Sequence, residues 1–272
     1  MRQVVTESLR QWILDQARAG STPESVLAAM KQGGWQEDVA LAALEDTLRT
    51  VVQAPRAVPF VRIEQRVHLD VGDRSVEVIA RLRHPVVTVL SGLLSESECD
   101  ELIEQSRPHL TRSETVRHVD GDSEVHEART SRGMFFERGQ TPLITRLESR
   151  IARLLNWPVD HGEGLQILNY RPGAEYRAHH DYFDPAQPGT PAILKRGGQR
   201  VGTLILYLNT PQSGGATTFP DVGFEVAPVK GHAVFFSYDR PHPATATLHA
   251  GAPVLSGEKW VATKWLREGV FT

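Results

Sequence analysis

Apolar residues near the N-terminus recur at the three- and four-residue spacing of amphipathic helices. One run contains Leu9, Trp12 and Ile13, and another falls in residues 37–48. Together with helix-start and helix-stop signals between them, this spacing predicts three short helices within residues 1–52. A bundle this small is marginally stable by itself. We therefore expect a helical module that acts as a structural appendage, or that docks a protein partner or a second copy of the chain.

The period of the apolar residues changes after this module. A segment rich in alanine and proline follows, and residues 63–82 then alternate between apolar and polar positions around a turn at residues 70–73. Alternation on both sides of a glycine-containing turn predicts a β-hairpin. We assign residues 53–84 to this linker and hairpin.

Short alternating runs separated by glycine and proline dominate the rest of the chain. Strands are predicted at residues 85–90, 165–170, 201–208, 233–238 and 259–266. Two stretches return to helical spacing, residues 95–107 and 141–156, and the first begins with a capping box at Ser95 and Glu98. Many short strands with turn signals are typical of a barrel or a sandwich. Residues 85–272 are thus expected to form one β-rich domain with helices outside, which gives an α+β protein.

Composition excludes several classes of partner. The net charge of −3 offers no basic surface for nucleic acid or for an anionic membrane. No apolar run approaches the roughly 20 residues of a membrane span. The single cysteine, Cys99, cannot form an internal disulfide, and charged residues interrupt the N-terminal apolar residues where a signal peptide would have an unbroken run. We expect a cytoplasmic protein in which Cys99 is a buried small residue.

Candidate metal ligands are concentrated in residues 176–266. On a strand, residues i and i+2 share a face, so His179 and Asp181 are expected to point in one direction while His180 points away. His249 is the candidate third ligand. Two imidazoles and one carboxylate on one side of Fe(II) leave three coordination positions for a bidentate cosubstrate and O2.

The His-x-Asp pattern alone does not identify a metal site, because it also occurs at His68–Asp70 and at His118–Asp120. The first of these lies in the predicted hairpin, and the second lies in a polar loop. Only the third copy is followed by a further histidine and then by a strand that begins with Lys259. A buried unpaired ammonium is costly, so we expect an anion to join Lys259, such as the distal carboxylate of 2-oxoglutarate. Alternation puts four residues of that strand on one face: Lys259, Val261, Thr263 and Trp265.

Five segments share an order and spacing that extend this interpretation. They are Arg129–Phe136, Gly162–Tyr170, His179–Phe183, Gly214–Pro220 and Leu248–Trp260. Over roughly residues 85–267, the chain resembles the prolyl 4-hydroxylase family of Fe(II)- and 2-oxoglutarate-dependent dioxygenases. The resemblance implies a double-stranded β-helix core with supporting helices packed outside it.

The resemblance also implies three groups of site residues. Iron would be held by His179, Asp181 and His249, the cosubstrate would be bound by Lys259, Thr217 and Tyr170, and the active site would be shaped by Tyr176, Arg200 and Trp265. Ordinary burial of core aromatics explains Tyr170, Tyr176 and Trp265 equally well.

The implied reaction hydroxylates an unactivated C–H bond with O2 and converts 2-oxoglutarate to succinate and CO2, with ascorbate as a reductant. Peptidyl proline is the expected substrate. Arg267, however, stands where collagen-type relatives have a histidine associated with peptide handling. This difference leaves a free amino acid or another small molecule as an alternative substrate, and a non-catalytic cupin-like metal-binding protein as another class. Residues 112–128 and 184–199 are the expected flaps over the substrate.

Overall fold

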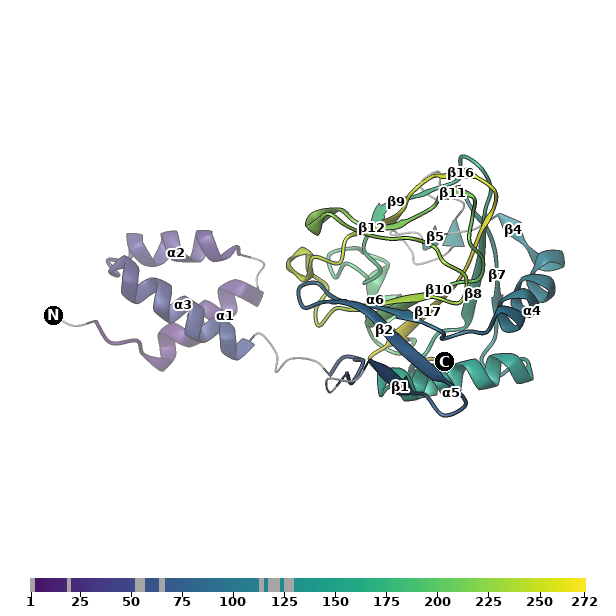
Figure 1. Ribbon diagram of the computed structural model, residues 1–272. Helices are drawn as coiled ribbons and strands as arrows, with labels where there is room; N and C mark the ends of the chain where they lie inside the picture. The colour runs from purple at the N-terminus through teal and green to yellow at the C-terminus, as the bar shows by residue number, and fades with distance from the viewer. Residues whose placement is uncertain are drawn as a thin grey trace. The chain divides into compact units, whose positions relative to one another are not determined.

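The computed structural model describes residues 3–18, 21–51, 57–63, 67–112, 115–116, 123–124 and 130–272. The chain divides into two compact units between Arg56 and Ala57 (Figure 1). Each unit has its own hydrophobic core, so each is described separately.

The N-terminal unit contains the three expected helices. They are α1 (Glu7–Arg18), α2 (Pro23–Gln32) and α3 (Glu37–Val51). Thr22 caps α2, because its hydroxyl accepts a hydrogen bond from the backbone N–H of Ser25 and Pro23 occupies the first helical position. Six buried residues form the core of this unit: Ile13, Val26, Met30, Ala40, Ala43 and Leu44.

The second unit is built on a nine-stranded antiparallel sheet. In spatial order its strands are β1 (His68–Asp70), β2 (Ser75–Leu82), β3 (Val86–Ser91), β14 (Ala233–Ser237), β10 (Arg200–Tyr207), β17 (Lys259–Arg267), β8 (Leu165–Tyr170), β7 (Arg132–Phe136) and β4 (Thr111–Arg112). The predicted hairpin is present as β1 and β2. Because β2 pairs with β3, the hairpin extends this sheet.

A smaller four-stranded sheet completes the double-stranded β-helix. Its order is β13 (Phe224–Val226), β12 (Thr217–Phe219), β15 (His249–Gly251) and β9 (Tyr176–His179). One buried cluster contains residues of both sheets, among them Tyr170, Tyr207, Phe219 and Phe236. Two further strand pairs are β11 (Ser213–Gly214) with β16 (Val254–Ser256), and β5 (Thr115–Val116) with β6 (Ser123–Glu124).

Two long helices support the main sheet, as the sequence predicted. They are α4 (Glu96–Ser106) and α5 (Pro142–Leu155), and α4 begins with the expected capping box of Ser95 and Glu98. Their apolar faces join one core with the sheet, and Cys99 is fully buried in it. Short helical turns occupy the connections: η1 (Arg107–His109), η2 (Val159–His161), α6 (Thr190–Leu194), η3 (Pro220–Val222) and η4 (Pro243–Thr245). We did not predict α6, which lies inside the expected flap at residues 184–199.

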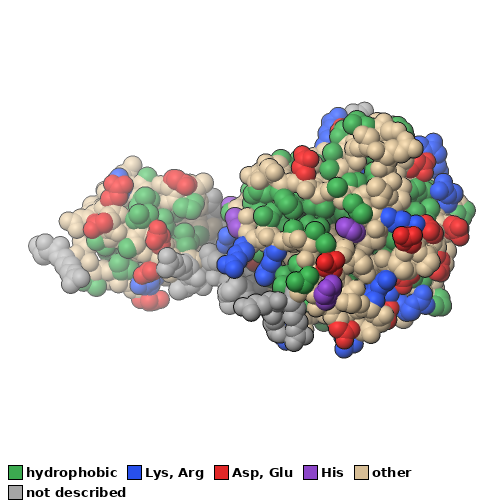
Figure 2. Space-filling model, viewed as in Figure 1, with side chains coloured by type: hydrophobic (Ala, Val, Ile, Leu, Met, Phe, Trp, Pro, Cys, Tyr) green, Lys and Arg blue, Asp and Glu red, His purple; other side chains and the backbone are tan. Residues whose placement is uncertain are grey.

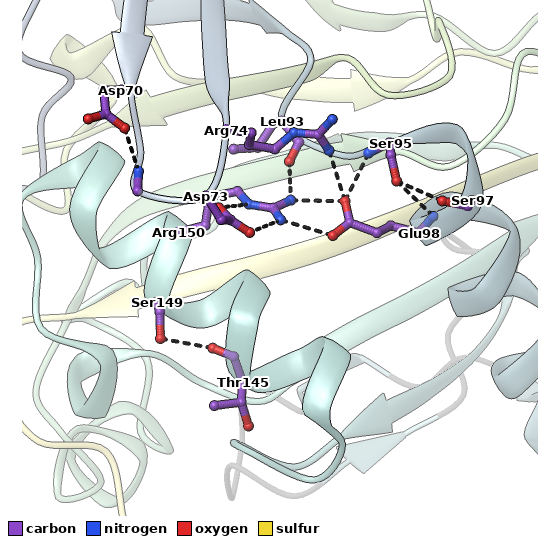
Figure 3. Close-up of polar contacts among 11 residues, drawn as sticks. Asp70, Asp73, Arg74, Leu93, Ser95, Ser97, Glu98, Thr145, Ser149 and Arg150 are labelled. Atoms are coloured by element: carbon purple, nitrogen blue, oxygen red, sulfur yellow. Dashed lines mark hydrogen bonds and ion pairs between the residues drawn. The ribbon is translucent and has the colours of Figure 1, made fainter.

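Arg150 on α5 ties the supporting helices to the hairpin (Figure 3). Its guanidinium is 2% exposed and uses all five N–H groups. It donates to both carboxylate oxygens of Asp73, to both of Glu98 and to the carbonyl of Leu93. Paired and fully hydrogen-bonded, this buried charge fixes the hairpin turn, the start of α4 and the middle of α5 against one another.

The surface agrees with the weak net charge. Basic and acidic side chains are interspersed on the visible face of the second unit, where apolar side chains also gather (Figure 2). Within the described part of the chain, none of the helices is both long enough and apolar enough to cross a lipid bilayer.

Candidate active site

The structure brings His179, Asp181 and His249 together. One ligand atom from each lies within 4.8 Å of the others. The two histidines come from neighbouring strands of the smaller sheet, where they are direct antiparallel partners on β9 and β15. Strand alternation was the wrong reason for including Asp181, because β9 ends at His179 and Asp181 reaches the cluster from the bend that follows.

The orientation of the imidazole rings fits a bound cation. Nδ1 of His179 lies 2.9 Å from the carbonyl oxygen of Arg177, and Nδ1 of His249 lies 3.0 Å from that of Thr247. A carbonyl can only accept, so each Nδ1 carries a proton, and Nε2 is the ring nitrogen left to bind a metal ion. Nε2 of His179 lies 3.5 Å from Oδ1 of Asp181, and Nε2 of His249 lies 3.5 Å from Oδ2. Acceptors that converge without a donor between them suit a divalent metal ion.

Burial and neighbouring charges shift the pKa values of two of the candidate ligands, His249 and Asp181. Burial, together with the nearby His179, lowers the pKa of His249 to about 4, so its imidazole is neutral at pH 7. Burial opposes the ionisation of Asp181, but His249, His179 and Arg200 outweigh it and hold the pKa of that carboxyl well below its usual range. A neutral imidazole and an ionised carboxylate are the forms that bind a metal.

The cluster forms part of a cleft of about 430 Å³, measured to its open mouth. Fourteen residues line it: Leu168, Tyr170, Tyr176, His179, Asp181, Ile205, Thr217, His249, Ala250, Gly251, Lys259, Val261, Thr263 and Trp265. The four residues of β17 predicted to share a face are all among them.

Lys259 is a buried cation in this cleft. It is 3% exposed, and no carboxylate of the described residues lies within ion-pair distance of its ammonium. Its Nζ lies 5.4 Å from the centre of the Tyr170 ring and 6.0 Å from that of Tyr207. Burial lowers the pKa of Lys259 to about 8. An unpaired buried ammonium beside aromatic rings can bind an anion that enters the cleft.

Thr217 and Tyr207 form a hydrogen-bonded pair at the cleft. Both side chains are buried, and the phenol of Tyr207 donates to the hydroxyl oxygen of Thr217 at 2.8 Å. Tyr207 was not predicted from the sequence. Alternation along residues 201–208, which puts it on the face of Thr203 and Ile205, could have indicated it.

Of the three remaining predicted residues, Tyr176 and Trp265 line the cleft and Arg200 does not. Tyr176 stacks on the ring of His179 with 3.7 Å between ring centres, and Trp265 lines the cleft. Arg200 is absent from the cleft lining and lies behind Trp265, with its guanidinium carbon 4.0 Å from the centre of that ring. It forms an ion pair with buried Glu163 at 2.7 Å.

Arg267 extends this ion pair toward the flap at residues 184–199. Its Nε lies 2.8 Å from the Glu163 carboxylate, and its Nη1 donates to the carbonyl of Gly198 at 2.6 Å. The guanidinium also lies over the ring of Phe183. At the same end of the flap, the amide of Gln199 bonds both the N–H and the carbonyl of Phe183. This end of the flap is therefore fastened to β17.

Of the other two His-x-Asp copies, only His68–Asp70 lies among the described residues, and it does not belong to the cluster. His68 lies on β1, and the Asp70 carboxylate accepts from the backbone N–H of Gly72 within the hairpin turn. His118–Asp120 lies outside the described residues, as does most of the expected flap at residues 112–128.

A His-Asp-His cluster inside a double-stranded β-helix, with a buried lysine in the same cleft, is typical of iron-dependent oxygenases. Comparisons with known proteins agree. Residues 165–267 match the family described as the 2OG-Fe(II) oxygenase superfamily, where 2OG is 2-oxoglutarate.

Individual proteins similar to this chain indicate one family within this superfamily. The chain is 36% identical over 221 residues to a probable prolyl 4-hydroxylase 3 of Arabidopsis thaliana, covering 74% of this chain and 75% of that protein. It is 35% identical to prolyl 4-hydroxylase 2 of the same plant, over 69% of each. Among solved structures, the 2-oxoglutarate complex of a viral collagen prolyl hydroxylase from Paramecium bursaria Chlorella virus 1 matches with 30% identity and a TM-score of 0.50, covering 66% of this chain and 95% of that one.

The chain therefore belongs to the prolyl 4-hydroxylase family of Fe(II)- and 2-oxoglutarate-dependent dioxygenases. It is an enzyme, and Fe(II) and 2-oxoglutarate are its cofactor and cosubstrate.

Proposed function

We propose that this enzyme hydroxylates prolyl residues of peptides at C4, with release of succinate and CO2. The observation that carries this proposal is the meeting of the His179, Asp181 and His249 cluster with buried Lys259 in one open cleft. The relatives support the substrate, because the two plant proteins are named prolyl 4-hydroxylases and the viral one is named a collagen prolyl hydroxylase.

In this proposal, His179, Asp181 and His249 hold the iron, which supplies the activation of O2 and the oxidation of the C–H bond when it is bound. Lys259 pairs with the distal carboxylate of 2-oxoglutarate. The Thr217 hydroxyl accepts from Tyr207, so its own proton is free to bond the same carboxylate. The apolar walls of the cleft exclude water around these contacts.

Tyr170, Tyr176, Trp265 and Arg200 shape the remaining walls. Tyr170 lies beside Lys259 and would contact the cosubstrate. Tyr176 fixes the ring of His179 by stacking, and Trp265 forms a wall on the substrate side. Arg200 would act indirectly, because it packs against the Trp265 ring on the side away from the cleft and is held there by its ion pair with Glu163.

A second substrate class has one observation in its favour. Arg267 is turned into the protein, where Glu163 and Gly198 occupy its guanidinium. It therefore does not present to a peptide the group that collagen-type relatives have at this position. The alternative is the same hydroxylation of a free amino acid or another small molecule.

Three accompanying predictions concern the setting of the enzyme. Ascorbate would restore iron oxidised in turnovers without substrate. The N-terminal unit would dock a protein partner or a second copy of the chain. The protein would work in the cytoplasm.

The test combines a panel of candidate substrates with substitutions of the proposed metal-binding residues. Succinate release is measured with proline-rich peptides, free proline and small-molecule extracts, and we expect the peptides to stimulate it most. His179→Ala and Asp181→Ala should abolish both Fe(II) binding and succinate release, whereas His68→Ala and His118→Ala should leave both intact. If free proline stimulates succinate release and the peptides do not, the substrate is a free amino acid. Equal losses of Fe(II) binding and succinate release in all four variants would refute the proposed set of metal ligands.

A further inference from the structure

The carboxylate of Asp181 is held by a hydrogen bond from outside the cluster. The hydroxyl of Thr203 lies 2.7 Å from Oδ2 of Asp181, and the phenol oxygen of Tyr238 lies 3.0 Å from the same Thr203 hydroxyl. Neither Thr203 nor Tyr238 was predicted from the sequence. Thr203 lies on β10, and Tyr238 follows the last residue of β14.

The direction of this relay follows by elimination. An ionised carboxylate can only accept, so Thr203 must donate its single hydroxyl proton to Asp181. The Thr203 oxygen then accepts from the phenol of Tyr238. Burial and the nearby Asp181 raise the pKa of Tyr238 well above its usual value, so the phenol keeps the proton that it donates.

The relay is also rigid. Thr203 is 0% exposed and Tyr238 is 2% exposed. Thr203 lies in the middle of the main sheet, opposite Phe236 on β14 and opposite Trp265 on β17. Neither hydroxyl can move to another partner without leaving a buried polar group unsatisfied.

The bond from Thr203 makes the two oxygens of Asp181 unequal. It withdraws electron density from Oδ2 and stops the carboxylate from turning, whereas the polar neighbour given for Oδ1 is Nε2 of His179 at 3.5 Å, the atom expected to bind the metal. We propose that Thr203, backed by Tyr238, holds Asp181 as a one-oxygen ligand to iron through Oδ1. This inference rests on the proposed iron site.

The consequence is an open coordination position. Two imidazoles and a one-oxygen carboxylate leave three of six positions, enough for a chelating cosubstrate and a diatomic gas. A carboxylate bound through both oxygens would leave two, which the cosubstrate alone would fill. Thr203 is thus a positioning residue that keeps the gas-binding position available.

Nitric oxide binding tests this position without turnover. Each protein is loaded anaerobically with Fe(II) and 2-oxoglutarate and titrated with nitric oxide, with the electron paramagnetic resonance signal of the adduct as the readout. Thr203→Val keeps the shape of the side chain and removes the donor. We expect its affinity for nitric oxide to fall about tenfold, the loss that corresponds to one hydrogen bond to a charged group. Thr203→Ser should restore most of the affinity.

Two further variants make the result interpretable. Tyr238→Phe removes only the second donor and should cause a smaller loss, and Thr88→Val removes a buried hydroxyl of β3 outside the cleft and should cause none. Wild-type affinity in a folded, iron-loaded Thr203→Val protein would overturn the proposal. If that variant does not fold, an unchanged affinity in Tyr238→Phe overturns it and a reduced one supports it. Failure of the unmodified protein to bind Fe(II) would instead refute the proposed iron site on which the inference rests.

Discussion

At the residue scale, the proposed role of Lys259 predicts that 2-oxoglutarate binding depends on pH. Its folded-state pKa is lowered to about 8 by burial, and the protonated form is the one that attracts a carboxylate. Affinity should therefore be constant well below pH 8 and should weaken as the pH rises through 8, by about tenfold for each further pH unit. Calorimetric titration of the Mn(II)-loaded protein with 2-oxoglutarate measures this.

Two substitutions separate the charge from the rest of the site. Lys259→Met should lower the affinity about tenfold to a hundredfold at pH 7, because a charge-assisted contact is lost. Lys259→Arg keeps a cation that does not lose its proton in this range, so the weakening above pH 8 should vanish. The same pH dependence in the arginine variant would show that another group causes it.

The residues that the sequence identified share one property, which is that local spacing or order along the chain marks them. His179, Asp181 and Lys259 each belong to a short pattern, and His249 follows from its place between them. Thr203 and Tyr238 belong to no recognisable sequence pattern, because their proposed roles depend on how β10 and β14 align. Register between strands is set by tertiary packing and turn geometry, which a single sequence specifies only weakly.

At the element scale, Arg267 is one of several residues that attach the flap at residues 184–199 to the end of the chain. Arg267→His removes the bond to the Gly198 carbonyl and shortens the side chain that lies over Phe183. The flap should then open more often, so that trypsin can bind the backbone on either side of Lys195 and Arg196, whose side chains are already exposed. Limited proteolysis monitored by mass spectrometry should show faster cleavage there.

Arg240→His is the matched control, since Arg240 is half exposed and pairs weakly with its neighbour Asp239. Its cleavage rate should equal that of the unmodified protein. If Arg267→His is cleaved no faster than this control, Gln199 and the remaining contacts are sufficient to hold the flap.

The prediction of elements was most accurate where a pattern was long. The helices α4 and α5 and the strands β8 and β17 were located to within a residue or two. The five-residue helix α6 was not predicted, because its length provides little more than one turn of periodicity. The hairpin was found, but its pairing with β3 depends on contacts across the sheet that alternation alone does not specify.

At the scale of the whole molecule, the chemistry is expected to reside in residues 57–272. All cleft-lining residues and two of the three buried clusters lie in that unit, while the third cluster lies wholly in the first. Removing residues 1–56 should leave 2-oxoglutarate turnover and the thermal midpoint of the β-rich unit unchanged. Succinate release and differential scanning calorimetry measure the two quantities.

Size-exclusion chromatography of the same pair of proteins tests the role of the N-terminal unit. A smaller oligomer after truncation would identify that unit as a dimerisation module, and an unchanged oligomer would favour docking of another protein. Loss of turnover with the β-rich fold intact would contradict its role as an appendage.

The pairing of His179 with His249 across β9 and β15 has a consequence for how the protein is made. These histidines are far apart in sequence, so a ribosome-bound chain that has extended only through β9 holds no complete ligand set. The complete set of candidate ligands exists only after β15 has joined the smaller sheet. Iron held by all three residues would therefore bind only after β9 and β15 have paired, so metal loading would follow formation of the smaller sheet.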